Sequence, residues 1–137
     1  MDERFFVKIG TDGRTMKVPV DPMAPVNTQI YHDIGCDIFE LVSCRRISPR
    51  WIMAVDEEGK LKKAPVLNLV ASWIYGSLDH WQMIVGDALI MKEVEGPDGG
   101  VLTPLTAQEA EQVLKDIGVF LGNTFARIDK AIGEVMS

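Results

Sequence analysis

The chain has 137 residues and a mass of 15.2 kDa, with 47% hydrophobic and 25% charged residues, which is typical of one globular domain. Its 14 Lys and Arg against 20 Asp and Glu give a net charge of −6, which argues against a nucleic-acid-binding protein because phosphate neutralisation needs a basic surface. No apolar stretch reaches the roughly 20 residues of a transmembrane helix, and Asp2 and Glu3 argue against a signal peptide. Two cysteines suit a reducing compartment, so we expect a cytoplasmic protein.

The N-terminal part of the chain predicts a β-hairpin and a short helix. Apolar and polar residues alternate over residues 4–9 and 15–20, and the Asp-Gly pair between these segments is a strong hairpin signal. Asn27 is a candidate N-cap for a helix over residues 28–34, which Gly35 would end in the left-handed conformation.

The middle of the chain predicts three further strands and a second helix. Residues 37–44 and 51–56 are two strands joined by an arginine-rich loop, and residues 83–94 form a longer strand with a bulge at Gly86. Pro65 permits a first helical turn, and the apolar run after it predicts a short helix.

The C-terminal part predicts a short returning strand over residues 101–103 and then one long helix. Thr106 and Glu109 fit a capping box, and apolar residues recur every three or four positions as far as Val135. The order of elements predicts an α+β fold with a mainly antiparallel sheet of about five or six strands, two short helices and a long C-terminal helix. We expect residues 1–105 to form the core domain and residues 106–137 to form a helix that packs on this core, on a second subunit, or on both.

The expected length of the C-terminal helix predicts self-association. From Thr106 to Met136 it would be about 45 Å long at 1.5 Å per residue, whereas a globule of this chain length is about 35–40 Å across. The helix therefore either breaks at Gly118 or Gly122 and folds back, or it stays whole and pairs with a second copy. We favour pairing, and hence a homo-oligomer, because no turn-rich segment interrupts the apolar pattern.

No catalytic or metal-binding motif is present in the sequence. His32, Cys36, Cys44 and His80 are suitable zinc ligands, but no Cys-x-x-Cys pair exists, and free cysteines are most often buried in the core. No serine stands in a Gly-x-Ser-x-Gly elbow. We therefore predict no metal, no cofactor and no catalytic residue, although an unrecognised enzyme stays an open alternative.

The basic residues are concentrated in one part of the chain. Residues 44–63 hold six basic and three acidic residues, a net charge of +3, so the remainder of the chain carries −9. Solvated loops are the favoured interpretation. The functional alternative is an anion site, because arginine forks suit phosphate or carboxylate. The candidate residues are Arg45, Arg46, Arg50, Lys60 and Lys62. If residues 37–44 and 51–56 pair as a hairpin, the arginines and the lysines lie at its opposite ends.

Asn68 is the sixth candidate, because it is an amide inside the apolar run of residues 65–70. A buried amide needs hydrogen-bond partners, and we expect these to be backbone groups, for example of the turn at residues 56–60. A direct contact with a ligand is the alternative.

The motifs just described resemble those of domain-of-unknown-function family 3846. The resemblance rests on residues 34–42, 51–61, 64–68, 84–89 and 102–106, and it covers about residues 5–116. Two positions depart from the family pattern, because Asp56 replaces an Asn and Leu69 replaces an Arg that often follows the second Asn. Both changes remove hydrogen-bonding groups and weaken a ligand role for this turn.

The resemblance implies a small α+β module of phages, plasmids and other mobile elements, without an established reaction. We therefore expect a non-catalytic accessory protein in the host cytoplasm that binds a host protein or a second copy of itself. The alternative is a protein that sequesters a small anionic, nucleotide-like molecule used in host defence signalling. Neither function requires a membrane or a nucleic acid.

Overall fold

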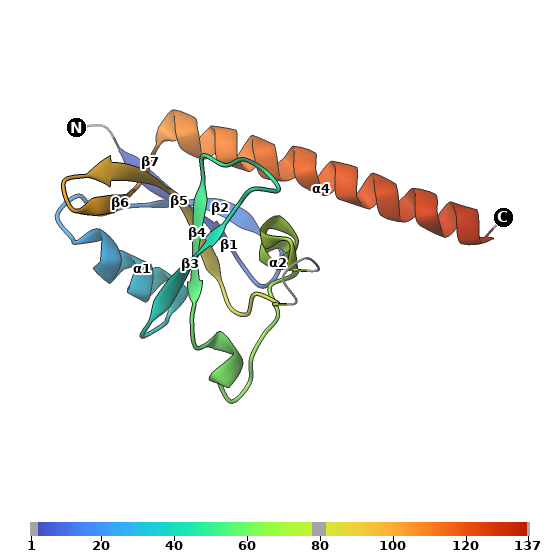
Figure 1. Ribbon diagram of the computed structural model, residues 1–137, viewed down its shortest axis with the longest axis horizontal. Coiled ribbons are helices and arrows are strands. Elements are labelled where there is room, and N and C mark those ends of the chain that lie inside the picture. Colours follow the sequence, from blue (N-terminus) through green and yellow to red (C-terminus); the bar gives the residue numbers. More distant parts are fainter. Residues whose placement is uncertain (1–2, 78–81, 137) are drawn as a thin grey trace.

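The computed structural model describes residues 3–77 and 82–136 of the chain, and in this part it forms an α+β fold (Figure 1). The helices are α1 (Val26–Ile34), the short 3-10 helix η1 (Gly59–Leu61), α2 (Leu69–Tyr75) and α4 (Ala107–Met136). The strands are β1 (Arg4–Ile9), β2 (Thr15–Pro19), β3 (Phe39–Ser43), β4 (Ile52–Asp56), β5 (Ala88–Gly96), β6 (Gly99–Thr103) and β7 (Leu105–Thr106). The predicted fold class is confirmed. The sheet has seven strands within these residues, one more than the five or six expected.

The strands form a single antiparallel sheet in the order β2-β1-β5-β4-β3, with β6 paired to β5 and β7 paired to β1. The hairpin expected at the N-terminus is present, and Gly13 takes the positive φ of 87° that its turn requires. The two strands expected in the middle of the chain also pair, with Phe39 opposite Asp56 and Ser43 opposite Ile52. These two pairs define the two ends of the β3–β4 hairpin.

Helices cover both faces of the sheet. Successive strand residues such as Phe6 and Val7 point to opposite faces of the sheet and belong to two separate buried clusters. The helices α2 and α4 pack on the Val7 face, and α1 packs on the Phe6 face. The basic candidate residues lie beyond the two ends of the β3–β4 hairpin, in the connection between its strands and after the end of β4.

Two expected boundaries were wrong, and a long-range contact explains both. The strand predicted over residues 83–94 begins only at Ala88, because Gly86 has a φ of 85° and the backbone changes direction there. The residues before Gly86 instead run beside residues 66–68, where Asn68 N donates to Ile84 O at 2.9 Å. The helix expected from Pro65 therefore begins at Leu69, after this contact.

The first helix also begins earlier than predicted, at Val26 with Pro25 as its N-cap residue, whereas Asn27 lies inside it. The predicted end of this helix is confirmed, because Gly35 takes the left-handed conformation with a φ of 72°. Proline suits the start of a helix since its missing N–H has no intrahelical partner there.

The C-terminal helix α4 is continuous over Ala107–Met136 and does not break at Gly118 or Gly122. The predicted capping box is confirmed, since Glu109 N donates to Thr106 Oγ1 at 3.1 Å and Thr106 N donates to Glu109 Oε1 at 2.9 Å. Its first half packs on the sheet and its second half extends beyond the body of the domain (Figure 1). The predicted overhang is therefore present in the structure.

Candidate functional site

The structure separates the predicted basic residues into two groups. Lys60 and Lys62 follow the Asp56 end of the β3–β4 hairpin, whereas Arg45, Arg46 and Arg50 lie in the connection between the strands at its other end. The hairpin places the two groups apart, as its pairing implies, so they do not form one site.

Lys62 is tied into the turn that follows β4. Its Nζ lies 2.7 Å from the Asp56 carboxylate and donates to Gly35 O at 3.0 Å. The hydrogen bond with Asp56 raises the pKa of Lys62. Asp56 also accepts a hydrogen bond of 2.9 Å from Glu58 N, so Lys62 and this carboxylate together join the turn to the end of α1. These contacts give Lys62 a structural role.

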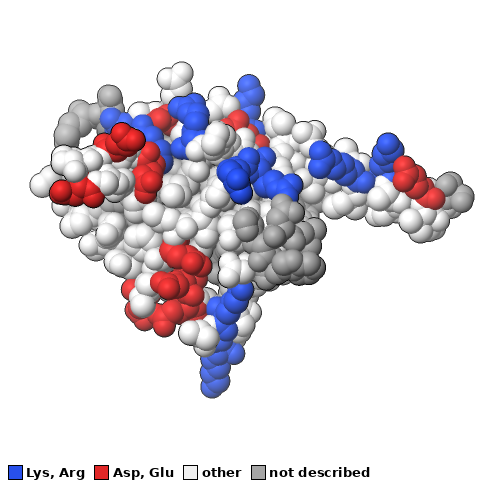
Figure 2. All heavy atoms as spheres, in the orientation of Figure 1, with Lys and Arg blue, Asp and Glu red and all other residues white. Residues whose placement is uncertain are grey.

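Lys60 lines a polar cavity of about 260 Å³ together with three carboxylates, those of Glu40, Asp56 and Glu57. Figure 2 shows a group of acidic side chains in the lower part of the view, next to basic side chains at the tip. Because carboxylates outnumber the ammonium group, the field in this cavity does not favour an anion. The lysine end of the hairpin is therefore a poor anion site.

Asn68 is fully buried and every hydrogen of its amide is used. Its Nδ2 donates to Ile9 O at 3.0 Å and to Gly86 O at 2.9 Å, while its Oδ1 accepts from Ala71 N at 3.1 Å. The expected backbone partners are present, but they belong to β1 and to the segment before β5 rather than to the turn at residues 56–60. Asn68 thus caps α2 and joins three segments of the chain.

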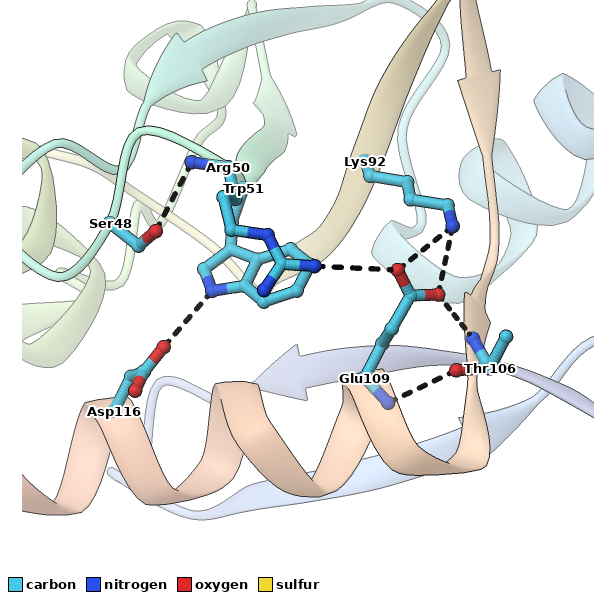
Figure 3. Close-up of polar contacts among 7 residues, drawn as sticks. All are labelled: Ser48, Arg50, Trp51, Lys92, Thr106, Glu109 and Asp116. Atoms are coloured by element: carbon cyan, nitrogen blue, oxygen red, sulfur yellow. Dashed lines mark hydrogen bonds and ion pairs between the residues drawn. The ribbon is translucent and has the colours of Figure 1, made fainter.

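Arg50 belongs to a network that fixes α4 on the sheet (Figure 3). Its guanidinium lies 4.7 Å from the centre of the Trp51 ring, and its Nη2 lies 3.9 Å from Glu109 Oε2. Lys92 Nζ donates to both carboxylate oxygens of Glu109 at 2.8 Å. Burial acts to raise the pKa of Glu109, but the hydrogen bonds from Lys92 and Thr106 outweigh it, so the pKa lies below its ordinary value.

The same network includes a second contact between the hairpin and α4. Trp51 Nε1 donates a hydrogen bond of 3.1 Å to Asp116 Oδ2, and Asp116 lies about two helical turns after Glu109 (Figure 3). The indole itself is buried, with 3% of its surface exposed. Arg50 and Trp51 therefore hold the N-terminal half of α4 in place, and the connection between β3 and β4 lies directly beside this helix.

Arg46 contributes to a groove between that connection and α4. The groove has a volume of about 340 Å³, and α4 contributes Lys115, Asp116, Asn123 and Arg127 to its lining. Figure 2 shows basic side chains gathered where the connection meets α4 and again farther along the helix. Arg45 is exposed in the same connection, and its backbone N–H is hydrogen-bonded to Ser43 Oγ.

Sequence reasoning missed the basic residues that α4 brings to this groove. Lys115 and Arg127 are far from Arg46 along the chain, so no local motif connects them. The available signal is their spacing, because residues 115, 119, 123 and 127 follow one another at intervals of four and share a helix face. The structure therefore joins one predicted site residue, Arg46, to two that were not predicted.

The described residues considered as metal ligands do not gather into a metal site. Cys44 belongs to the buried cluster on the α4 face and Cys36 to the cluster on the α1 face, while the His32 side chain is exposed and contacts Asp33. Burial raises the pKa of the Cys44 thiol to about 12, and burial with the nearby Asp56 charge raises that of Cys36. His80 lies outside the described residues. Residues 3–77 and 82–136 contain no cluster of three or more potential metal ligands.

The last candidate surface is the projecting half of α4. Phe125, Ile128, Ile132 and Val135 are exposed by 51%, 40%, 55% and 83%, respectively. None of the described helices has the length and hydropathy needed to cross a bilayer. An apolar stripe of this kind on an otherwise charged helix is characteristic of a surface that pairs with another helix.

These features define a small α+β domain whose antiparallel sheet carries a projecting C-terminal helix. The chain belongs to the family described as Domain of unknown function (DUF3846), whose family model matches residues 12–118. Neither a curated protein nor a solved structure matches the chain. The resemblance seen in the sequence is thereby confirmed. The family match ends inside α4, so the projecting half of this helix lies outside the matched residues.

Proposed function

We propose that this chain is a non-catalytic accessory protein of a phage or other mobile element, and that it acts by self-association through the projecting half of α4. The observation that carries the proposal is the row of exposed apolar side chains beyond the domain body. Leaving such a row in water costs free energy, and a partner that covers it recovers about 25 cal/mol per Å² of apolar surface.

The apolar residues of α4 have the spacing of a two-helix seam. Leu121, Phe125, Ile128, Ile132 and Val135 follow one another at intervals of four, three, four and three. Leu121 packs against the core of its own domain, and Phe125 packs against Trp73 of α2. The same stripe then continues through Ile128, Ile132 and Val135, which are all exposed in the single chain, so the pattern itself indicates a second helix.

The charges of the projection are compatible with a second copy of the same helix. Between Phe125 and Met136 the helix carries two basic and two acidic residues, although the whole chain has a net charge of −6. The segment therefore has no net charge, so two copies do not repel each other along it, and two-fold pairs are the commonest oligomers.

Light scattering after size exclusion tests the proposal. Wild-type protein at high concentration is expected to have twice the 15.2 kDa mass of the chain. Ile128→Glu and Ile132→Glu each place a charge in the seam, so these variants are expected to be monomers with an unchanged circular dichroism spectrum. Ala126→Glu is the matched control because it adds the same charge to an exposed position away from the stripe.

Retention of the dimer in Ala126→Glu and its loss in both isoleucine variants is the result that supports self-association. A wild-type protein that runs as a monomer at every concentration would contradict it. Equal loss of the dimer in the control variant would show that general charge, rather than the stripe, controls assembly.

A further inference from the structure

We infer that the groove between residues 44–50 and α4 binds a small, elongated ligand with more than one phosphate, of the size of a dinucleotide. This inference does not depend on self-association, because the groove lies within one copy of the chain. It rests on the charge of the groove, on the spacing of that charge and on the other groups that line it.

The groove is positively charged in a negatively charged protein. Arg46, Lys115 and Arg127 line it together with a single carboxylate, Asp116. The two oxygens of that carboxylate accept hydrogen bonds from Trp51 Nε1 at 3.1 Å and from Gln112 Nε2 at 2.7 Å. The groove thus holds three cationic side chains and one carboxylate whose two oxygens are already used, a lining that favours a bound anion.

Two of these cations, Lys115 and Arg127, form no ion pair with any of the described acidic residues. Elsewhere on the molecule Lys17 pairs with Glu111 at 2.6 Å and Lys62 pairs with Asp56 at 2.7 Å. Within residues 3–77 and 82–136, neither Lys115 nor Arg127 has a carboxylate oxygen within the 4.0 Å of an ion pair. Their donors are therefore open to an anion from solution.

The spacing of the cations indicates an elongated ligand. Lys115 and Arg127 are twelve residues apart on α4, or about 18 Å at 1.5 Å per residue, which exceeds the size of one phosphate. The connection that carries Arg46 lies beside this stretch of helix. A single phosphate reaches one of these cations at a time, whereas a molecule with two separated phosphates reaches several, and arginine suits phosphate because its fork forms paired hydrogen bonds.

The rest of the lining suits a base or a sugar. Phe120 is half-buried and Val119 is 58% exposed, so the groove has an apolar surface beside its cations. The Asn123 amide offers both a donor and an acceptor at the same place. The volume of about 340 Å³ is at the lower end of the roughly 300–1,000 Å³ of ligand pockets. Because the groove is open, we expect micromolar affinity. A long nucleic acid is disfavoured by the overall charge of −6.

Calorimetric titration of the full chain with three probes tests this inference. The probes are a 5′-phosphorylated adenine dinucleotide, adenosine monophosphate and inorganic phosphate. The dinucleotide is expected to bind most tightly. Adenosine monophosphate lacks one phosphate and is expected to bind at least about tenfold more weakly, and inorganic phosphate, which also lacks the base and sugar, is expected to bind most weakly. Lys115→Gln and Arg127→Gln are each expected to weaken dinucleotide binding by about tenfold.

Lys63→Gln is the matched control, since it removes the same charge from an exposed position at the other end of the β3–β4 hairpin. Unchanged binding by this variant, together with the losses at Lys115 and Arg127, supports the groove. The inference is overturned if the dinucleotide does not bind at millimolar concentration, or if Lys63→Gln weakens binding as much as the groove variants. Ile132→Glu, which lies farther along α4 than the groove residues, is expected to bind as the wild type does, and this separates the site from assembly.

Discussion

Trp73 of α2 and Phe125 of α4 pack edge to face, with ring centroids 5.9 Å apart, and they mark the point where α4 leaves the domain. Before this contact the helix buries Ala110, Val113 and Ile117 in the core. Every residue after it, from Ala126 to Met136, is exposed. The first half of this continuous helix therefore stabilises the sheet, whereas its second half carries the exposed apolar stripe for which we propose a partner.

Replacing Asn68 with Ala is expected to lower the free energy of unfolding by at least about 2 kcal/mol, because it removes the N-cap of α2 and leaves the buried Ile9 and Gly86 carbonyls without a donor. Urea denaturation measures this change. Asn27→Ala alters an exposed amide and serves as the control, with an expected change within about 0.5 kcal/mol. A loss of dinucleotide binding without a loss of stability would instead assign Asn68 to a ligand.

Gly59 and Gly118 are expected to respond in opposite directions to substitution by Ala. A Cβ at Gly59 would lie 3.0 Å from Val85 O and 3.2 Å from Val85 Cβ, and such overpacking costs about 1–3 kcal/mol. A Cβ at Gly118 would meet nothing within 4 Å, and Ala in a helix is up to about 1 kcal/mol more favourable than Gly. Thermal unfolding of both variants decides this, and a stabilised Gly59→Ala would disprove the close approach.

The Glu109 carboxylate is expected to make stability depend on pH in the acidic range. Because its pKa in the folded protein lies below the ordinary value of 4.5, the ionised form stabilises the fold above that pH. This contribution is lost as the pH falls through the folded-state pKa. Glu109→Gln is therefore expected to be less stable than the wild type by about 1–3 kcal/mol near neutral pH, with a difference that shrinks in acid.

Glu111→Gln is the control for this pH experiment. Its carboxylate pairs with Lys17, but 62% of its side chain is exposed, so its loss is expected to cost less than about 1 kcal/mol at any pH. Chemical denaturation across the acidic range measures both variants. A constant difference between Glu109→Gln and the wild type would mean that the ion pair with Lys92 does not couple stability to pH.

The features that sequence alone determined are those encoded within a few residues. The Asp-Gly hairpin, the left-handed Gly35, the capping box of Thr106 and Glu109, and the continuous apolar period of α4 all agree with the structure. Each depends on backbone geometry or on contacts between residues close in the chain. The family was also accessible from sequence, because its motifs are local.

Only the tertiary structure decided where distant segments meet. It placed the segment before β5 beside residues 66–68, so Asn68 bonds to Ile9 and Gly86 and the predicted strand begins at Ala88. It likewise brought Arg46 to Lys115 and Arg127 of α4. Contacts of this kind depend on how the helices pack on the two faces of the sheet. No short pattern specifies that packing, because every side chain in the core contributes to it.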